Sequence, residues 1–428
     1  MARLTSFLKS LTTPEDRLSG AEGLMTYVYG PYDPQKHTKE NWQPGPYREN
    51  KSRYLWTDAF GVVNFISLAE LTGKPHYLDQ ADALIKNVHN ILGRQRGGSS
   101  LGVGASSHQP RLLGASDDHP TKGGLRIGKV HPEEHPDGDG QYYHYITRWA
   151  FALNRMSLAR NDAKYNNWAV ELLKAVHPHF VYRTSGGGVP KMYWKISIDM
   201  KRPMVPSEGN LDPFDGLITV RLLQNTAAAF RGRKNKEGGV GGEGGRVEEK
   251  EDVLVKEEED FLSMVEIKYR RYHSSDPLDL GEALWLTHWA LASDSSPSKS
   301  GVTMPSSTGA GEAAQGEKVK EEAWARFIAT QSIQSLDKLW RDGYFSEPAG
   351  YRLAFREFGT TLGVQVNPVA ATTSTSQWKK ERIDALHTFW ASRVIERDMD
   401  ITPVMMASSL VPGAWDKNFK FKKGEEEE

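Results

Sequence analysis

The sequence predicts an all-α fold in which helices come in pairs and the pairs close into a ring. Five stretches look alike, each with a polar or acidic start followed by an amphipathic run rich in aromatic residues. A second, more ordinary helical pattern follows each of them. Alternating helix pairs of this kind close into a toroid in which the starts of the inner helices converge on one pocket. The five stretches are residues 53–71, 139–158, 212–226, 279–292 and 352–366.

The first expected helix precedes these five pairs and supplies a partner for the last helix of the chain, which follows them. It spans residues 14–29. Thr13 or Thr12 is a candidate N-cap, Pro14 takes the first helical position, and Glu15 and Asp16 follow in the first turn. With it, the helices form six pairs, and the first and last helices meet. In chain order the expected helices are 14–29, 53–71, 75–93, 139–159, 162–180, 213–230, 253–272, 279–292, 318–340, 352–366, 377–397 and 402–410.

Several connecting segments do not follow the helical period. Residues 97–138 form a long connection rich in Gly, Ser, His and Pro, which is typical of a functional or disordered loop. Residues 182–210 contain the alternating run KMYWKISIDM after three glycines, which predicts a small hairpin or extended arm.

Two low-complexity inserts and a charged tail complete the chain. The inserts, at about 231–250 and 293–317, cannot bury a core, and the tail from about 418 is expected to be disordered. Helices on both sides of each insert are needed to finish the ring. We therefore expect residues 1–428 to form a single domain.

Composition and charge narrow the classes of function. The formal net charge is −1, and Lys and Arg do not gather in one block, which argues against nucleic acid as a partner. There is no cysteine, so disulfides and thiolate catalysis are excluded. No stretch approaches the ~18 apolar residues of a membrane span, and the N-terminus lacks a secretory apolar core. We expect a soluble, cytoplasmic protein with no membrane partner; the oligomeric state is not predicted.

Over residues 14–410, this layout resembles the (α/α)6 toroid of six-hairpin glycosidases and of sugar epimerases of the N-acylglucosamine 2-epimerase type. The resemblance rests on the helix pairs and on the aromatic content, 12 Trp and 16 Tyr. It implies parallel inner helices whose N-terminal ends form the active face, a carbohydrate substrate, and a pair of carboxylates that cleaves a glycosidic bond. One toroid family of mannan-cleaving enzymes uses adjacent aspartates in an aromatic helix. The adjacent pair here, Asp117 and Asp118, lies in a Ser/His/Pro loop instead.

Carboxylates near the inner-helix starts are the candidate catalytic groups. We favour Asp139 and Glu282, followed by Asp58 and Glu208. Such a carboxylate can serve as general acid or base when burial and neighbouring charges set its pKa. Structural alternatives stay open: Asp139 as a helix cap, a salt bridge from Asp58 to Arg53, and an exposed turn at Glu208.

Candidate substrate-binding residues surround these acids. The arginines could pair with the acids or bind an acidic sugar or phosphate, and aromatic rings could stack on a sugar. The set comprises Trp56, Tyr143, His144, Arg148, Trp194, Asp215, His288 and Arg356.

Three hypotheses of function follow. The first is a glycoside hydrolase that uses two carboxylates. The second is a sugar epimerase or isomerase in which His144 or His288 moves a proton. The third is a non-catalytic toroid that binds a carbohydrate or serves as a scaffold. We expect no metal or other cofactor, because the run HPEEHPDGDG matches neither the zinc nor the calcium-loop spacing.

Overall fold

The computed structural model of the protein consists almost entirely of helices. Within the described residues lie twelve α-helices and five short strands. The prediction of an all-α fold is confirmed. The described residues are 8, 11–45, 53–97, 109–184, 186, 188–237, 253–291, 310–371 and 377–421.

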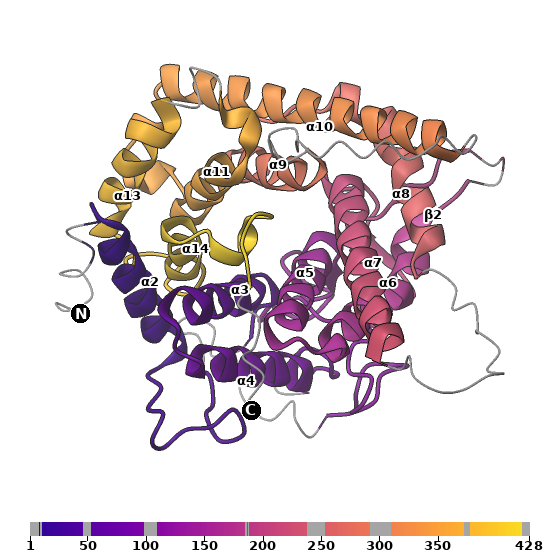
Figure 1. The fold of residues 1–428 in the computed structure, drawn as a ribbon, viewed down its shortest axis with the longest axis horizontal. Coiled ribbons are helices and arrows are strands. Elements are labelled where there is room, and N and C mark those ends of the chain that lie inside the picture. The colour runs from indigo at the N-terminus through magenta and orange to yellow at the C-terminus, as the bar shows by residue number, and fades with distance from the viewer. Residues whose placement is uncertain are drawn as a thin grey trace.

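Six helices form an inner ring in which each packs against the next one along the chain. The last inner helix also packs against the first, so the ring is closed. Figure 1 shows these helices around the centre of the molecule. In chain order they are α3 (Leu55–Thr72), α5 (Tyr143–Arg160), α7 (Asp212–Glu237), α9 (Pro277–Ala290), α11 (Ala354–Val366) and α14 (Ile401–Leu410).

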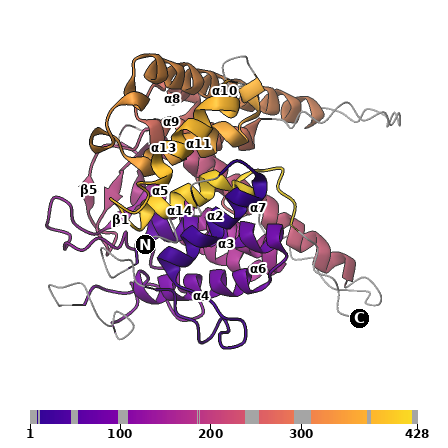
Figure 2. The same ribbon diagram turned by 90° about the vertical axis from the view of Figure 1, so that its left-hand side faces the viewer.

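A partner helix covers each inner helix from outside. The sixth partner, α2 (Pro14–Tyr29), comes from the N-terminus and packs against α14, as Figure 2 shows from the side. Six hairpins therefore close the ring, and the predicted (α/α)6 toroid is confirmed. The other partners, which follow α3, α5, α7, α9 and α11 in that order, are α4 (His76–Ile91), α6 (Ala163–Phe180), α8 (Val255–Lys268), α10 (Ala310–Arg341) and α13 (Ile383–Ala391).

The two rings differ in how their helices are buried. Every residue of α3 from Leu55 to Ala69 is buried, because neighbouring helices and the ring centre surround it. Its partner α4 buries one stripe, which includes Leu84 and Val88, and leaves Lys86 in solvent. A helix that is apolar all round belongs in a core, whereas an amphipathic helix covers one.

The start of α2 follows the prediction closely. The backbone N–H of Asp16 donates to the side chain of Thr13 at 3.1 Å, and the N–H of Thr13 donates back to the Asp16 carboxylate at 3.3 Å. Pro14 occupies the first turn, where its missing N–H costs nothing. This capping box fixes the point at which the closing helix begins.

Helices α9 and α11 approach each other at glycines. A Cβ on Gly281 would overlap the backbone oxygen of Gly359, and a Cβ on Gly363 would overlap the backbone oxygen of Gly281. The two backbones are therefore closer than side chains would permit.

Short strands form the predicted arm and also change one helix boundary. The arm contains β2 to β5 and pairs with β1 just before α5. The helix expected from Asp139 begins only at Tyr143, because the two residues before it are held in the sheet; Asp139 is thus not its N-cap. The strands are β1 (Gln141–Tyr142), β2 (Val181–Tyr182), β3 (Lys191–Met192), β4 (Lys195–Ile196) and β5 (Pro203–Val205).

Parts of the predicted inserts are helical. Helix α7 continues to Glu237, and α10 begins at Ala310, so each runs into a segment expected to lack structure. The rest of both inserts, and the tail after Phe421, lie outside the described residues. None of the helices described here has the length and apolar composition of a membrane span.

Candidate active site

Three inner helices meet at the side chain of Arg148. It lies in the second turn of α5 and is 1% exposed. Its Nη2 is 2.8 Å from Oδ1 of Asp215 in α7, and its Nε donates to the Glu282 carboxylate of α9 at 3.1 Å. Nη2 also contacts Glu282. Both carboxylates therefore contact one nitrogen atom, which brings two acidic groups from different helices close together.

A narrow cavity lies beside this cluster. Of the acidic residues around Arg148, Glu282 lines the cavity, and its side chain is 12% exposed. The space open to the centres of water-sized spheres is about 20 Å³, enough for about one water molecule, so the lining side chains must move before a larger ligand enters. The lining residues are Trp56, Phe60, Arg148, Leu278, Gly281, Glu282, Trp285, Gly359, Leu362, Met405 and Trp415.

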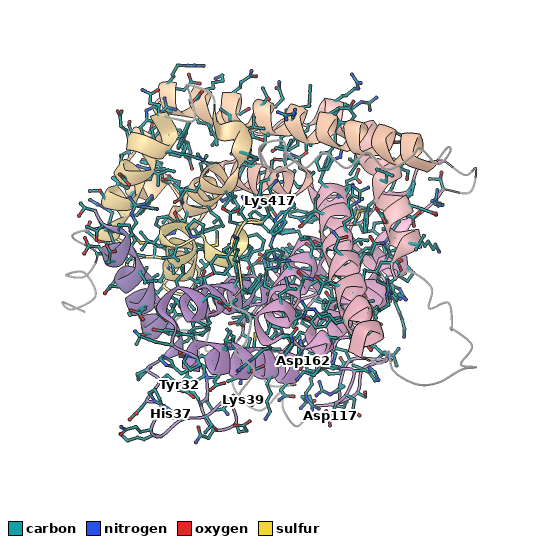
Figure 3. The ribbon with its side chains drawn as sticks, in the orientation of Figure 1. Tyr32, His37, Lys39, Asp117, Asp162 and Lys417 are labelled. Atoms are coloured by element: carbon teal, nitrogen blue, oxygen red, sulfur yellow. The ribbon has the colours of Figure 1, made fainter. Side chains whose placement is uncertain are left out.

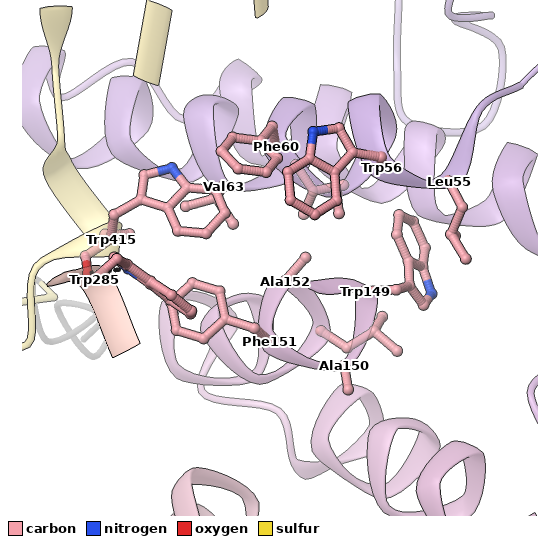
Figure 4. Packing of buried hydrophobic residues seen from close by; sticks show 14 of the residues in the cluster. Leu55, Trp56, Phe60, Val63, Trp149, Ala150, Phe151, Ala152, Trp285 and Trp415 are labelled. Carbon is pink, nitrogen blue, oxygen red and sulfur yellow. Dashed lines mark hydrogen bonds between the residues drawn. The ribbon is translucent and has the colours of Figure 1, made fainter. Parts of the chain in front are cut away.

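Aromatic rings form one wall of the cavity. Trp415 comes from the segment after α14 and enters the ring, where its centroid lies 4.4 Å from Phe60, 5.1 Å from Phe151 and 5.4 Å from Trp285 (Figure 4). The Trp285 indole donates to the backbone oxygen of Trp415 at 3.0 Å, and the Arg148 guanidinium carbon lies 4.1 Å from the centre of the Trp285 ring. The segment after α14 thus builds part of this site.

Three buried donors at the cavity lack an acceptor among the described residues: Nη1 of Arg148 and the indole nitrogens of Trp56 and Trp415. A buried N–H without a partner costs about 1–3 kcal/mol. All three belong to residues that line the cavity.

Burial raises the pKa values of two aspartates near Arg148. Burial raises the pKa of Asp215 to about 7; the charge of Glu282 adds to the shift, and Arg148 opposes it. Burial also raises the pKa of Asp212, at the start of α7, well above its ordinary value. Both groups therefore hold a proton at a pH where an exposed aspartate has lost it.

His144 lies next to these acids and is neutral. Burial lowers the pKa of its imidazole to about 4, and its Nδ1 is 3.9 Å from Oδ1 of Asp212. Its ring also meets Trp56 edge-on, with centroids 5.3 Å apart. A neutral imidazole beside a protonated carboxyl group provides both a proton acceptor and a proton donor near the cavity.

A series of aromatic contacts leads from the cavity toward the surface. Trp56 lies 5.3 Å from Tyr145, Tyr145 lies 5.3 Å from Tyr142, and Tyr142 stacks on Trp194 at 5.3 Å. Trp194 belongs to the arm and is 36% exposed. The arm therefore places an accessible aromatic ring on the same side as the inner-helix starts.

The predicted catalytic residue Asp139 is engaged in a different network. It is fully buried and pairs with Arg96 at 2.9 Å and with Arg126 at 2.6 Å. Backbone N–H groups of Gly128 and Gly140 also donate to it, at 2.9 and 3.0 Å. These contacts hold together the connection between α4 and β1, and Asp139 does not line the central cavity.

Asp58 and Glu208 also lie apart from the Arg148 cluster. Asp58 pairs with Arg53 at 3.4 Å, as the structural alternative anticipated, and accepts from the Tyr29 hydroxyl at 3.3 Å. Glu208 pairs with Lys268 at the end of α8. Among the four predicted catalytic residues, Glu282 alone lines the described cavity.

The predicted substrate-binding residues also divide into some at or near the cavity and some elsewhere. Trp56 and Arg148 line the cavity, Asp215 contacts Arg148, and His144 contacts Trp56. Trp194 lies on the exposed arm, two aromatic rings away from Trp56. The remaining three are elsewhere: Tyr143 is buried against Phe180 and Phe261, His288 accepts from the backbone of Lys417 at the far end of α9, and Arg356 pairs with Asp276.

Sequence reasoning missed Trp415 and Phe60 as cavity residues. Phe60 lies one turn after Trp56 in α3, so its helical spacing could have indicated a shared face. Trp415 follows the last predicted helix in a short irregular segment. No periodicity links that segment to the ring centre.

Comparisons with known proteins give two similar structures. The chain matches no protein-family model and no curated protein. It is similar to a family 76 glycoside hydrolase from a bovine Bacteroides thetaiotaomicron strain, with 12% identity, a TM-score of 0.49, and coverage of 93% of this chain and 76% of that one. It is also similar to a D-mannose isomerase, with 10% identity, a TM-score of 0.46, and coverage of 95% of this chain and 98% of that one.

Proposed function

We propose that this protein is a carbohydrate-active enzyme, a glycoside hydrolase that cleaves a sugar bound beside Glu282, where the inner helices meet. The observation that carries the proposal is the contact of two carboxyl groups, Glu282 and Asp215, with one nitrogen of Arg148 beside an aromatic-walled cavity. Glycosidases use two carboxyl groups whose surroundings give them different protonation states.

In this mechanism the two acids have different roles. Asp215, whose pKa is raised to about 7, keeps a proton that it can donate to the glycosidic oxygen as the C–O bond breaks. Glu282 is paired with Arg148 and lines the cavity. As a carboxylate, it acts on the sugar carbon directly or through a water molecule. Arg148 holds both groups in place and carries the compensating positive charge.

The aromatic wall favours a sugar over a flexible apolar ligand. Trp56, Trp285 and Trp415 offer aromatic rings for the C–H groups of a sugar. A sugar presents both apolar faces and hydroxyl oxygens. Trp194, exposed on the arm, would stack on a further sugar unit.

A sugar isomerase or epimerase is the second candidate, because of His144 and Asp212. Their 3.9 Å separation and their opposite pKa shifts pair a neutral base with a protonated acid. Such a pair can take a proton from one carbon of a sugar and return it to another position. This chemistry would leave the mass of the substrate unchanged.

Product analysis of a panel of oligosaccharides and monosaccharides tests these proposals. We expect wild type to release a smaller sugar, and Glu282→Gln to lose about 10²–10⁴-fold in kcat, since the amide can be neither base nor nucleophile. Glu266→Gln, an exposed change on α8, is the matched control.

The alternatives give different products. An unchanged mass with a new NMR spectrum, lost in His144→Ala and retained in Glu282→Gln, would replace the hydrolase by an isomerase. Binding of sugars without turnover by wild type would reject both enzymes in favour of a carbohydrate-binding protein.

A further inference from the structure

A second hollow, of about 470 Å³, lies on the outside of the ring. It is formed by α4, the start of α6, the loop that contains Lys39, and the segment 109–120. Figure 3 shows Lys39 and Asp117 along the same edge of the molecule. None of the residues that line this hollow lines the central cavity, so the two sites are separate.

Positive charge predominates in this hollow. Of its three acidic residues, Asp82 is already paired with Arg160, at 2.7 Å, and contacts the Tyr165 hydroxyl. Lys39 and Lys86 are exposed, and neither forms an ion pair with another of the described residues. Its charged lining residues are Lys39, Lys86, Arg94, Arg111 and Lys164, against Glu40, Asp82 and Asp117.

Two arginines in the hollow share one exposed carboxylate. Oδ1 of Asp117 lies 2.6 Å from Nη2 of Arg111 and 3.6 Å from Nη2 of Arg94, although the Asp117 side chain is 84% exposed. An exposed side chain leaves such a position easily, because water replaces its contacts at little cost. The carboxylate of Asp117 thus occupies a place that a stronger anion could take.

The arginines themselves are fixed by the backbone. Arg94 donates to the backbone oxygen of Gln109 at 2.9 Å, and Arg111 donates to that of His89 at 3.2 Å. The Nε of Arg94 is buried and has no acceptor among the described residues. Two guanidinium groups are therefore held in place beside the Asp117 carboxylate, which lowers the entropy cost of binding an anion.

An aromatic wall adjoins these charges. The Trp168 ring is half-buried, packs edge-on against His89 at 5.3 Å, and has the ammonium of Lys164 5.5 Å from its centre. Its indole donates to the backbone oxygen of Asp118 at 3.0 Å. This wall suits the organic part of a ligand, next to the cationic groups that would hold its charged end.

We propose that this hollow binds a small phosphate monoester. The phosphate displaces the Asp117 carboxylate from Arg94 and Arg111, and Lys39 and Lys86 complement its second negative charge. A phosphate monoester carries about −1.5 to −2 charges and three acceptor oxygens at neutral pH, so it pairs with two guanidinium groups better than a single carboxylate does. No bond is made or broken.

Calorimetric titration of the full chain with inorganic phosphate, glucose 6-phosphate and glucose tests the site. We expect both phosphates to bind in a way that depends on the arginines of the hollow, and any binding of glucose to be the same in wild type and in the variants below. Asp117→Asn removes the competing carboxylate and should tighten phosphate binding by about tenfold, whereas Arg94→Gln should weaken it by about tenfold. Asp118→Asn is the matched control, since it removes the same charge one residue away and should change affinity little.

Exposed variants keep the test independent of folding. Lys39→Ala and Lys86→Ala alter solvent-facing side chains, and each should weaken binding and reduce its salt dependence. Absence of phosphate binding in both wild type and Asp117→Asn would overturn the proposal. Equal effects of Asp117→Asn and Asp118→Asn would also overturn it, because they would reflect general surface charge.

Discussion

At the scale of single residues, Arg148 determines the character of the central site. It is buried, and it compensates the charge of acids that would otherwise repel each other. Removal of one partner from such a network leaves an uncompensated charge, which is strongly destabilising. The arginine therefore serves the fold and the chemistry together.

The raised pKa of Asp215 predicts a specific pH dependence of stability. Between its ordinary pKa of 3.8 and its folded pKa of about 7, the folded protein holds a proton that the unfolded chain has released. The free energy of unfolding contributed by this group therefore falls as the pH rises through that window. Asp215→Asn removes this contribution. The free energy of unfolding of the variant should therefore fall less than that of wild type as the pH rises through this window.

Urea unfolding of wild type and Asp215→Asn at several pH values across this window measures the difference. Asp279, whose pKa burial raises to about 6, contributes in the same direction in both proteins and cancels in the comparison. Identical slopes for the two proteins would mean that Asp215 is ionised throughout.

The site was only partly predictable because ion pairs depend on contacts between distant residues. Glu282, Arg148 and Asp215 were singled out separately, and the fold brings them into one cluster. Asp139 had the same local signature. Its partners, Arg96 and Arg126, come from a loop without periodicity, so nothing in the local pattern distinguished a structural acid from one at the cavity.

At the scale of helices, the sequence predicted those helix boundaries that depend on interactions between neighbouring residues. The capping box of α2 was readable because its donors and acceptors lie three residues apart. The start of α5 was misplaced by four residues because β1 pairs with β4, more than fifty residues later. Strand pairing with a remote segment overrode the helical pattern.

The glycine contact between α9 and α11 predicts a large effect of one added methyl group. Gly281→Ala places a Cβ against the Gly359 backbone, which cannot rotate away as a side chain could. We expect a loss of about 1–3 kcal/mol in the free energy of unfolding. Gly350→Ala is the control, because its Cβ would meet nothing within 4 Å. Chemical denaturation compares the two, and equal stabilities would show that the helices can move apart freely.

At the scale of the whole molecule, a closed ring predicts cooperative behaviour. Every inner helix packs against two inner neighbours, so no hairpin has a free inner edge. We therefore propose that the chain is a single domain. Differential scanning calorimetry should give one transition whose calorimetric and van't Hoff enthalpies agree. Two resolved transitions would divide the ring into separate units.

Deletion of residues 1–30 tests the closing pair directly. This variant loses α2, whose buried Leu24, Met25 and Val28 contribute about 1.5–3 kcal/mol each. The sum is comparable to a total stability of about 5–15 kcal/mol. We expect the truncated chain to lose its cooperative thermal transition, while deletion of residues 422–428 should not. A truncated chain that melts like wild type would mean that α14 needs no partner.

The pairing of α2 with α14 also has a consequence for biosynthesis. The ribosome releases α3, which also packs against α2, soon after α2, but it releases α14 only about 370 residues later. At about 5–20 residues per second, that delay lasts tens of seconds. Throughout this time the part of α2 that packs against α14 lacks its native contacts, and the ring of the nascent chain stays open.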